Sequence, residues 1–369
     1  MKISIGSKIV EGPWGGGNLF YLNLKNYLIS QGHEVVFDLL HSDIDIILLT
    51  DPRKKIKSSA TFSLREIIFY KKFVNKNVRI IQRVNECDER KGTTGINETY
   101  LNASSIADHV VFVSDWLRKI YLKLGLATSK TSVIMSGSDK DIFFPRTDQI
   151  KKEYEKFKIV THHWSSNINK GYNTYKKLDD LLNQKVWKNK IEFTYIGNIS
   201  KEFELLHTKI IKPLNGKLLA DELRKHHIYL TGSINEPSGN HHIEAALCGL
   251  PIIYYDSGGI PEYCRDFGIS FVDNLEEALK NMIIKYDVLK NTIKSYPFNS
   301  VKMSQDYLSL FQIQKFKGTN SYSENKVLIF LFFKFIKFKN FLEFNYLTFI
   351  QSIRKFYLNT FRRFFQTNQ

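Results

Sequence analysis

The sequence has few cysteines, fewer acidic than basic residues, and no long uninterrupted apolar segment. Its 369 residues include three cysteines, Cys87, Cys248 and Cys264, and their spacing fits neither a zinc site nor a redox pair. The first residues, MKISIGSKIVEG, lack the apolar segment and small-residue cleavage site of a signal peptide. We therefore expect the folded body to lie in a reducing cytoplasm.

The shortage of acidic residues leaves a strong positive charge. Lysine and arginine number 53 and aspartate and glutamate 37, a net charge of +16. Such a charge attracts nucleic acid, anionic lipid or a phosphorylated substrate. Without a zinc finger or an RNA-recognition aromatic set, a nucleic-acid binder has little support, and we predict no nucleic-acid partner.

Much of this charge lies at the C-terminal end. Residues 326–369 contain eight basic residues and a single acid, Glu343, together with 12 of the 28 phenylalanines. From Tyr346 onward, large apolar residues recur every three or four positions, with basic residues mostly between them. This pattern predicts a basic amphipathic helix that suits an anionic membrane surface. The alternative is a helix packed on the body or on a second subunit.

The longest apolar run of this segment, Val327–Phe333, is far too short to span a bilayer. We therefore predict a basic aromatic tail over residues 319–369 and peripheral attachment to the inner face of the membrane.

The rest of the chain alternates strand and helix signals, which indicates an α/β fold with parallel sheets. The predicted buried strands fall into two series. They are Lys2–Gly6, Val35–Leu40, Ile44–Leu49, Val78–Val84 and His109–Val113, then Lys158–Trp164, Ile191–Gly197, His226–Gly232, Pro251–Tyr255 and Ile269–Asp273. A polar, lysine-rich stretch between Pro145 and Phe157 suits a linker. We predict two Rossmann-like domains facing a cleft, residues 1–150 and 151–318, with a final helix after Ser295 that returns to the first domain.

In open parallel sheets, ligands bind beyond the carboxyl ends of the strands, so loops after strands are the candidate sites. The loop GPWGGGN, Gly12–Asn18, follows the first strand and opens a helix. Its glycines allow close approach of a ligand, and the helix start favours an anion. The alternatives are a turn without a ligand, or a dehydrogenase in which Asp38 binds a ribose. The loop lacks the G-x-G-x-x-G pattern that a dehydrogenase needs.

A longer motif lies in the second half, EPSGNHHIEAALCGLPIIYYDSGGIPE, from Glu236 to Glu262. Glu236 follows a predicted strand, and Glu244 lies in the next predicted helix. Ser238, Gly239 and Asn240 come at the start of that helix, where free N–H groups can hold a sugar or phosphate oxygen.

This motif resembles the donor-binding region of family 4 glycosyltransferases, which have the GT-B fold. Their pattern is a Glu, seven residues, a second Glu, then Gly-x-Pro and Gly-Gly-x-x-Glu; here these are Glu236, Glu244, Gly249–Pro251 and Gly258–Glu262. The glycine loop, the segment Val111–Tyr121 and the segment Val133–Pro145 are similar to parts of the same family. The resemblance covers roughly Met1 to Phe316 and excludes the tail.

The resemblance implies roles for individual residues. Glu244 would bind the donor ribose and Glu236 would contact the transferred sugar. Gly16 and Gly17 would approach the diphosphate from the first domain. Lys170, in NKGY, would match the lysine that neutralises the diphosphate, although a lysine alone is more often an exposed surface residue.

Two positions depart from the family pattern. Trp164 stands where the family usually has an arginine, six positions before the lysine, so one cation is missing unless His162, His163 or nearby serines compensate. The family's histidine after the fourth strand of the first domain is also missing. Asn85, Asp88 and Arg90 occupy that region as acceptor-side candidates, or are ordinary loop residues.

The resemblance implies a retaining transfer of a sugar from a nucleotide-diphosphate sugar to a cell-envelope glycan or lipid-linked acceptor. The leaving group is a nucleoside diphosphate, so catalysis needs charge stabilisation more than a strong base. We assign no Asp-x-Asp cation motif of the metal-dependent sugar transferases, and we predict no metal or other cofactor. The alternative is an inactive homologue that binds sugar nucleotides or glycans, which Trp164 suggests.

Overall fold

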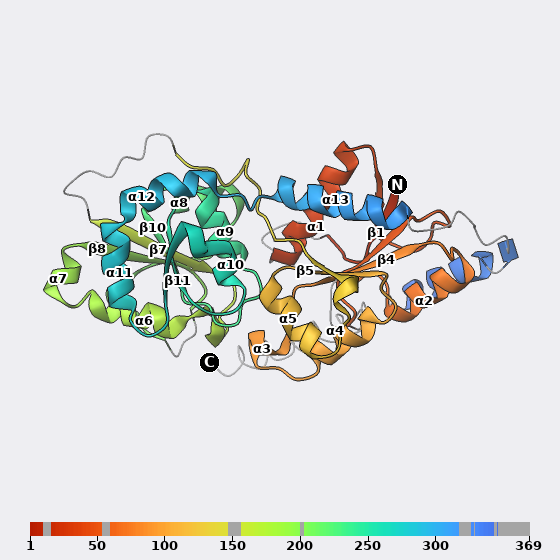
Figure 1. Cartoon of the computed structure of the whole chain (residues 1–369), viewed down its shortest axis with the longest axis horizontal. Coiled ribbons are helices and arrows are strands. Elements are labelled where there is room, and N and C mark those ends of the chain that lie inside the picture. Colours follow the sequence, from red (N-terminus) through yellow and green to blue (C-terminus); the bar gives the residue numbers. More distant parts are fainter. Residues whose placement is uncertain are drawn as a thin grey trace, which may run out of the picture.

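The computed structural model describes residues 1–9, 16–53, 60–146, 156–199, 203–316, 326–327, 329–342 and 345. They form two parallel six-stranded sheets, each covered by helices on both faces. The first sheet and its helices lie in the right half of Figure 1, and the second in the left half. The α/β class with two Rossmann-like units, predicted from the alternation of strands and helices, is confirmed.

The strands of the first sheet lie in the order β2-β1-β3-β4-β5-β6. Their bounds are β1 (Lys2–Ile5), β2 (Glu34–Val36), β3 (Ile46–Leu49), β4 (Arg79–Val84), β5 (His109–Phe112) and β6 (Thr131–Val133). Register pairs such as Ile3 with Ile46 and Ile47 with Ile80 run in parallel across the sheet. The chain reverses its direction of winding between β1 and β3, which marks a ligand-binding switch point.

Both faces of this sheet are buried, and alternate side chains of β3 show how. Ile46 and Leu48 pack with one set of helices, whereas Ile47 and Leu49 pack with the other. A strand buried on both faces must be apolar throughout. This explains why IILL is entirely buried.

Five helices of the first half cover the sheet, α1 (Gly16–Ser30), α2 (Leu64–Phe73), α3 (Asp88–Lys91), α4 (Ile96–Ser104) and α5 (Asp115–Lys123). Helix α2 begins at a capping box in which Ser63 and Glu66 bond each other's backbone N–H groups. Helix α5 begins at Ser114, whose hydroxyl accepts a hydrogen bond from the Leu117 N–H.

The strands of the second sheet lie in the order β12-β11-β10-β7-β8-β9. Their bounds are β7 (Phe157–His163), β8 (Ile191–Gly197), β9 (Lys209–Ile211), β10 (Ile228–Thr231), β11 (Ile252–Tyr255) and β12 (Gly268–Phe271). Its switch point lies between β7 and β10. The residues after these two strands are therefore placed to meet a ligand.

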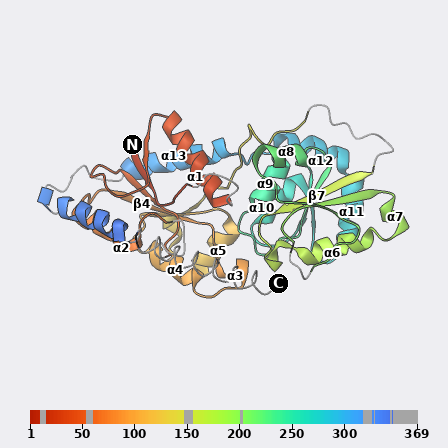
Figure 2. The same cartoon turned by 180° about the vertical axis from the view of Figure 1, so that it is seen from behind.

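Two buried clusters enclose this sheet. One side is covered by α6 (Tyr172–Leu181), α7 (Lys185–Lys188), α11 (Leu275–Ile284) and α12 (Tyr286–Thr292), and the other by α8 (Gly216–Leu223), α9 (Asn240–Leu247) and α10 (Ile260–Cys264). Figure 2 shows the same arrangement from behind.

The chain crosses between the halves twice, and the two crossings run side by side. The Ser300 N–H donates to the Ser138 carbonyl at 2.8 Å. A Cβ at Gly137 would lie 2.2 Å from the Asn299 backbone, so only glycine allows this approach. Helix α13 (Ser300–Phe316) then packs on α1 of the first half, where Met303, Tyr307 and Phe311 join its core.

Residues 329–342 form a further helix beside α2. Phe332 and Ile336 enter the core of the first half, and the Phe332 ring meets Tyr70 edge-on. In the part of the chain that the structure describes, no helix is long and apolar enough to span a bilayer. The predicted amphipathic helix after Tyr346 lies outside the described residues, as does most of the predicted linker.

Candidate active site

A cavity of about 440 Å³ lies between the two halves. The first half contributes Gly17, Arg83, Asn85 and Arg90 to its lining. The second half contributes a larger set: His162, His163, Trp164, Lys170, Glu236, Ser238, Gly239, Asn240, His241 and Glu244. The volume suits a ligand of the size of a small cofactor or nucleotide.

Glu236 follows β10 and lies almost fully buried in this cavity wall. Its loop rests on the two glycines of the Gly-Gly-x-x-Glu motif. A Cβ at Gly258 would lie 2.6 Å from the Glu236 carbonyl oxygen, and one at Gly259 would lie 2.2 Å from that of Pro237. The Gly259 N–H also donates to the Glu236 carbonyl at 2.9 Å. The motif therefore shapes the loop that presents Glu236.

Two cations from opposite halves meet on the Glu236 carboxylate. Arg90 Nε lies 3.0 Å from Oε1, and Lys170 Nζ pairs with Oε2. Lys170 ends the short 3₁₀ helix Ile168–Lys170, after β7. Burial alone would raise the pKa of Glu236, but the charges of Arg90 and Lys170 outweigh it and lower that pKa. Glu236 is therefore an anion at neutral pH.

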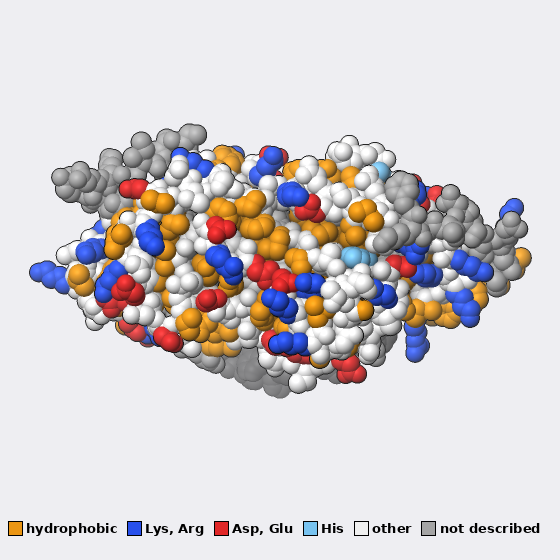
Figure 3. All heavy atoms as spheres, viewed as in Figure 1, with side chains coloured by type: hydrophobic (Ala, Val, Ile, Leu, Met, Phe, Trp, Pro, Cys, Tyr) orange, Lys and Arg blue, Asp and Glu red, His pale blue; other side chains and the backbone are white. Residues whose placement is uncertain are grey.

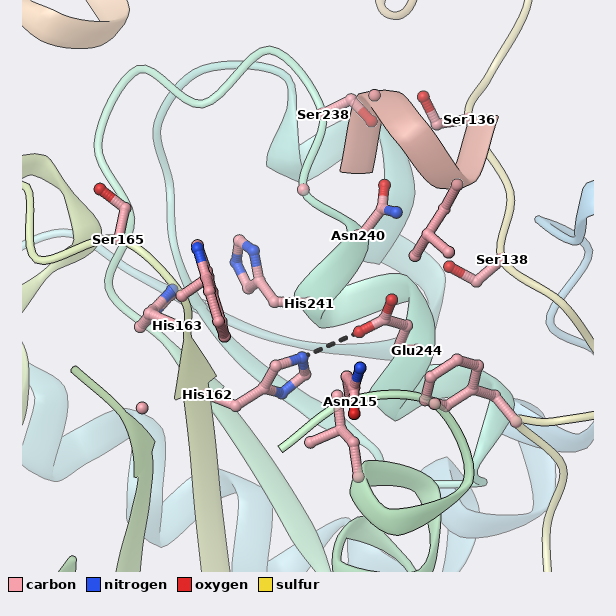
Figure 4. Close-up of a pocket in the computed structure, with 18 of the residues that line it drawn as sticks. Ser136, Ser138, His162, His163, Ser165, Asn215, Ser238, Asn240, His241 and Glu244 are labelled. Carbon is pink, nitrogen blue, oxygen red and sulfur yellow. Dashed lines mark hydrogen bonds and ion pairs between the residues drawn. The ribbon is translucent and has the colours of Figure 1, made fainter. Parts of the chain in front are cut away.

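Glu244 lies on α9, with its side chain turned toward the cavity (Figure 4). Its Oε2 lies 3.0 Å from His162 Nε2, at the end of β7. Asn240 and Ser238 lie at the start of the same helix, where Gly239 provides no side-chain cap. The first-turn N–H groups of α9 therefore have no capping side chain from Gly239 and remain available for a ligand oxygen.

A layer of buried histidines lies behind these groups. The His163 and His241 rings are 4.8 Å apart, and the His241 and His242 rings are 5.0 Å apart. Burial lowers the pKa of His163 and His241 well below the usual value and that of His242 to about 3. His163 is therefore neutral at physiological pH and cannot replace the missing cation. Sequence reasoning missed this layer, although the repeated His-His pairs were a visible signal.

The other predicted site residues divide between the cavity and its surroundings. Trp164 is 52% exposed and lines the cavity. Asn85 also lines it. Asp88 does not, because its carboxylate accepts hydrogen bonds from the Ile96 and Asn97 N–H groups, each at 3.0 Å.

Helix α1 begins at Gly16, and Gly17 lines the cavity. Residues 10–15 of the glycine loop lie outside the described residues. Arg90, predicted on the acceptor side, is also a partner of Glu236, a role that its loop position did not indicate.

Two Asp-x-Asp triplets do occur in the sequence, and neither forms a metal centre among the described residues. Asp43 pairs with Lys2 at 2.9 Å and Asp45 with Lys315 at 3.1 Å, and neither lines the cavity. Asp139 lines the cavity, but its Oδ1 accepts a hydrogen bond from the Asp141 N–H at 2.9 Å. Metal independence stays a prediction.

Comparison with known families identifies the second half. Residues 144–294 match the family model described as "Glycosyl transferases group 1". The match covers less than half of the chain, and over it the chain is similar to group 1 glycosyl transferases. The matched region contains Lys170, Glu236, Glu244 and the Gly-Gly-x-x-Glu motif, so the family resemblance predicted from these residues is confirmed.

Solved structures show that the whole fold is shared. HepE of Anabaena, in complex with UDP and glucose, superimposes with a TM-score of 0.60 at 14% identity, covering 84% of this chain and 99% of that one. Sucrose-phosphate synthase of Thermosynechococcus elongatus gives 0.57 at 15% identity, covering 85% and 99%. The chain therefore has the GT-B fold of glycosyltransferases.

A curated relative aligns with only part of this chain. The phosphatidylinositol N-acetylglucosaminyltransferase gpi3 subunit of Schizosaccharomyces pombe is 26% identical over 228 residues, which is 56% of this chain and 47% of that protein. The chain thus spans about half the length of this curated relative.

Proposed function

We propose that this protein is a retaining glycosyltransferase that moves a sugar from a nucleotide-diphosphate sugar to a cell-envelope glycan or lipid-linked acceptor. The single observation that carries the proposal is the meeting of Glu236, Glu244 and Lys170 in one cavity of a GT-B fold. The HepE structures with UDP and with UDP-glucose, which share this fold, support a nucleotide-sugar donor.

The donor groups have a natural order along the cavity. Glu244 can accept two hydrogen bonds from ribose hydroxyls, and the His162 contact fixes the orientation of its carboxylate. The start of α9 offers N–H groups to the diphosphate. Glu236, one loop away, is placed to accept hydrogen bonds from the hydroxyls of the transferred sugar.

Lys170 supplies the charge that the leaving group needs. It pairs with Glu236 in the structure, and a bound diphosphate would offer it a second anion close by. As the bond to the sugar breaks, negative charge grows on the diphosphate, and a fixed cation there stabilises the transition state. Arg90 remains on Glu236 and keeps that carboxylate charged.

We also propose that the tail attaches the enzyme to an anionic membrane surface on the cytoplasmic side. The helix 329–342 buries one side in the first domain and exposes phenylalanines on the other, with Phe335 at 56% and Phe338 at 62%. Lys334 and Lys337 lie among them. Figure 3 shows hydrophobic side chains beside basic ones at this end of the molecule. The name of the gpi3 relative contains a lipid, phosphatidylinositol, which supports this location.

The donor test is a thermal-shift screen of nucleotide-sugars on the wild type, Glu244→Ala and the control Glu277→Ala, an exposed carboxylate on α11. One donor should raise the Tm of the wild type and of the control but not of Glu244→Ala. Binding without turnover across acceptors would favour the inactive homologue. No shift with any donor would contradict the proposal.

The membrane test is flotation with phosphatidylserine-containing vesicles. Wild type should float, and the variant with Phe335→Ser and Phe338→Ser, both exposed positions, should float less. Equal flotation of both proteins would refute a membrane contact through this helix.

A further inference from the structure

Arg83 is a buried charge for which the described residues provide no counter-ion. It lies near the end of β4 and lines the cavity, yet its side chain is only 4% exposed. Within the described residues, its Nε and Nη1 atoms have no hydrogen-bond partner, and no acidic side chain forms an ion pair with it. An arginine cannot shed its proton to relieve this, because its pKa lies too high.

The other buried arginine of the body shows how such a group is normally satisfied. Arg224 is equally buried, but it pairs with Asp221 at 2.5 Å and donates to the carbonyls of Ile142 and Phe144. Leaving a buried charge unpaired is strongly destabilising. An unpaired arginine kept at a cavity wall is therefore expected to have its partner among the ligands.

The surroundings of Arg83 hold it in place without neutralising it. Its guanidinium lies over the Phe20 ring, 3.9 Å from the centroid. Cation–π contact uses the flat face of the guanidinium and leaves its edge N–H groups for an acceptor. Tyr307 of α13 lies beside it: burial raises the pKa of that hydroxyl, and the Arg83 charge opposes the rise. A guanidinium edge fits a carboxylate or phosphate with two parallel hydrogen bonds.

The place of Arg83 indicates which ligand carries the anion. It belongs to the first domain, whereas Lys170 and the start of α9, which we assign to the donor diphosphate, belong to the second. We propose that Arg83 forms an anion subsite on the acceptor side, binding a phosphate or carboxylate group of the acceptor molecule. The assignment of the anion to the acceptor molecule rests on the proposed function. The existence of an anion site at Arg83 does not.

Two measurements on the full chain test it without any glycosyl transfer. Arg83→Met keeps the side-chain bulk and removes the charge, so its Tm without added anion should rise by about 2 °C or more, since it removes an unpaired buried charge. Inorganic phosphate, titrated at constant ionic strength, should raise the Tm of the wild type and of the control Arg118→Met. It should raise that of Arg83→Met much less, with Arg83→Lys in between.

A lower Tm for Arg83→Met, with an unchanged response to phosphate, would show a structural residue and overturn the proposal. Repeating the titration with saturating UDP separates the two sources of the anion. The phosphate shift should persist with UDP present, whereas its loss would assign Arg83 to the donor diphosphate and also overturn the proposal. Failure of the proposed function would look different, because no nucleotide would then change the Tm of the wild type.

Discussion

The carboxylate of Glu262 accepts hydrogen bonds from the backbone N–H groups of Asp115 and Trp116, each at 2.7 Å. Glu262 is the last residue of the Gly-Gly-x-x-Glu motif, in α10 of the second domain, and Asp115 and Trp116 open α5 of the first. A carboxylate at a helix N-terminus satisfies free N–H groups and the helix dipole. One domain thus caps a helix of the other.

Glu262→Ala should therefore destabilise the protein by about 1–2 kcal/mol, the usual cost of losing a helix cap. Urea unfolding of the variant measures this directly, with Glu277→Ala as the surface control. Because the cap crosses the domain boundary, small-angle scattering should also show a wider spread of domain orientations. Unchanged stability and scattering would mean that the two hydrogen bonds contribute nothing.

Arg90→Met should change how the free energy of unfolding varies with pH. The charges of Arg90 and Lys170 lower the folded-state pKa of Glu236 below the ordinary value of a glutamate, so the stabilisation is full above that ordinary value and is lost as the pH falls through the folded value. Without Arg90, burial of Glu236 is less opposed, and its pKa should rise. The variant should be about 1–2 kcal/mol less stable than wild type at pH 7.

This difference should shrink near pH 4, where Glu236 of the variant takes up a proton. Urea unfolding at the two pH values measures it, and Arg118→Met, which removes an arginine of a half-buried pair on α5, is the matched control. A stability difference that is the same at both pH values would mean that Arg90 acts through packing alone.

Lys170→Met should lower kcat by about 100-fold or more, as the loss of one fixed charge at a developing anion does. The free nucleoside should still bind, because Glu244 is untouched. Lys176→Met on α6 removes a lysine whose shorter ion pair, with Asp180 at 2.8 Å, lies on the surface, and it should leave kcat unchanged. A variant at position 170 with full kcat would remove Lys170 from the mechanism.

Activity should survive EDTA, because the cavity offers Lys170 and the start of α9 to the diphosphate. The assay compares initial rates before and after chelation, with magnesium or manganese added back. Loss of activity that either metal restores would refute this prediction, and Asp139 would then be the first carboxylate to replace.

Much of the fold could be predicted because its signals are local. Parallel strands buried on both faces are continuous apolar runs, so nearly all of them stand out in the sequence. Strands β6 (Thr131–Val133) and β9 (Lys209–Ile211) did not, because each is an edge strand of three residues and none of their residues is fully buried. Edge strands lack the apolar pattern that buried strands need.

The candidate site was only partly predictable for a different reason. Glu236 and Glu244 lie in one ordered motif, and Lys170 lies in the NKGY segment of the same domain. Arg83 and Arg90 act through what surrounds them after folding. Arg83 has no counter-ion in the part of the chain that the structure describes, and Arg90 reaches a carboxylate 146 positions away in the second domain. The residues next to Arg83 and Arg90 in the sequence do not indicate which side chains will surround them in the folded protein.

The return of α13 to the first domain has a consequence for synthesis. Met303, Tyr307 and Phe311 complete a core that begins with Ile3 and Ile5. A chain emerging from the ribosome makes the first domain first, and such domains usually fold as they appear. Here one face of that domain stays uncovered until the second domain has been made, so the nascent chain carries exposed apolar surface while the second domain is being synthesised. The first domain therefore begins to be synthesised before the second domain but completes its core after it.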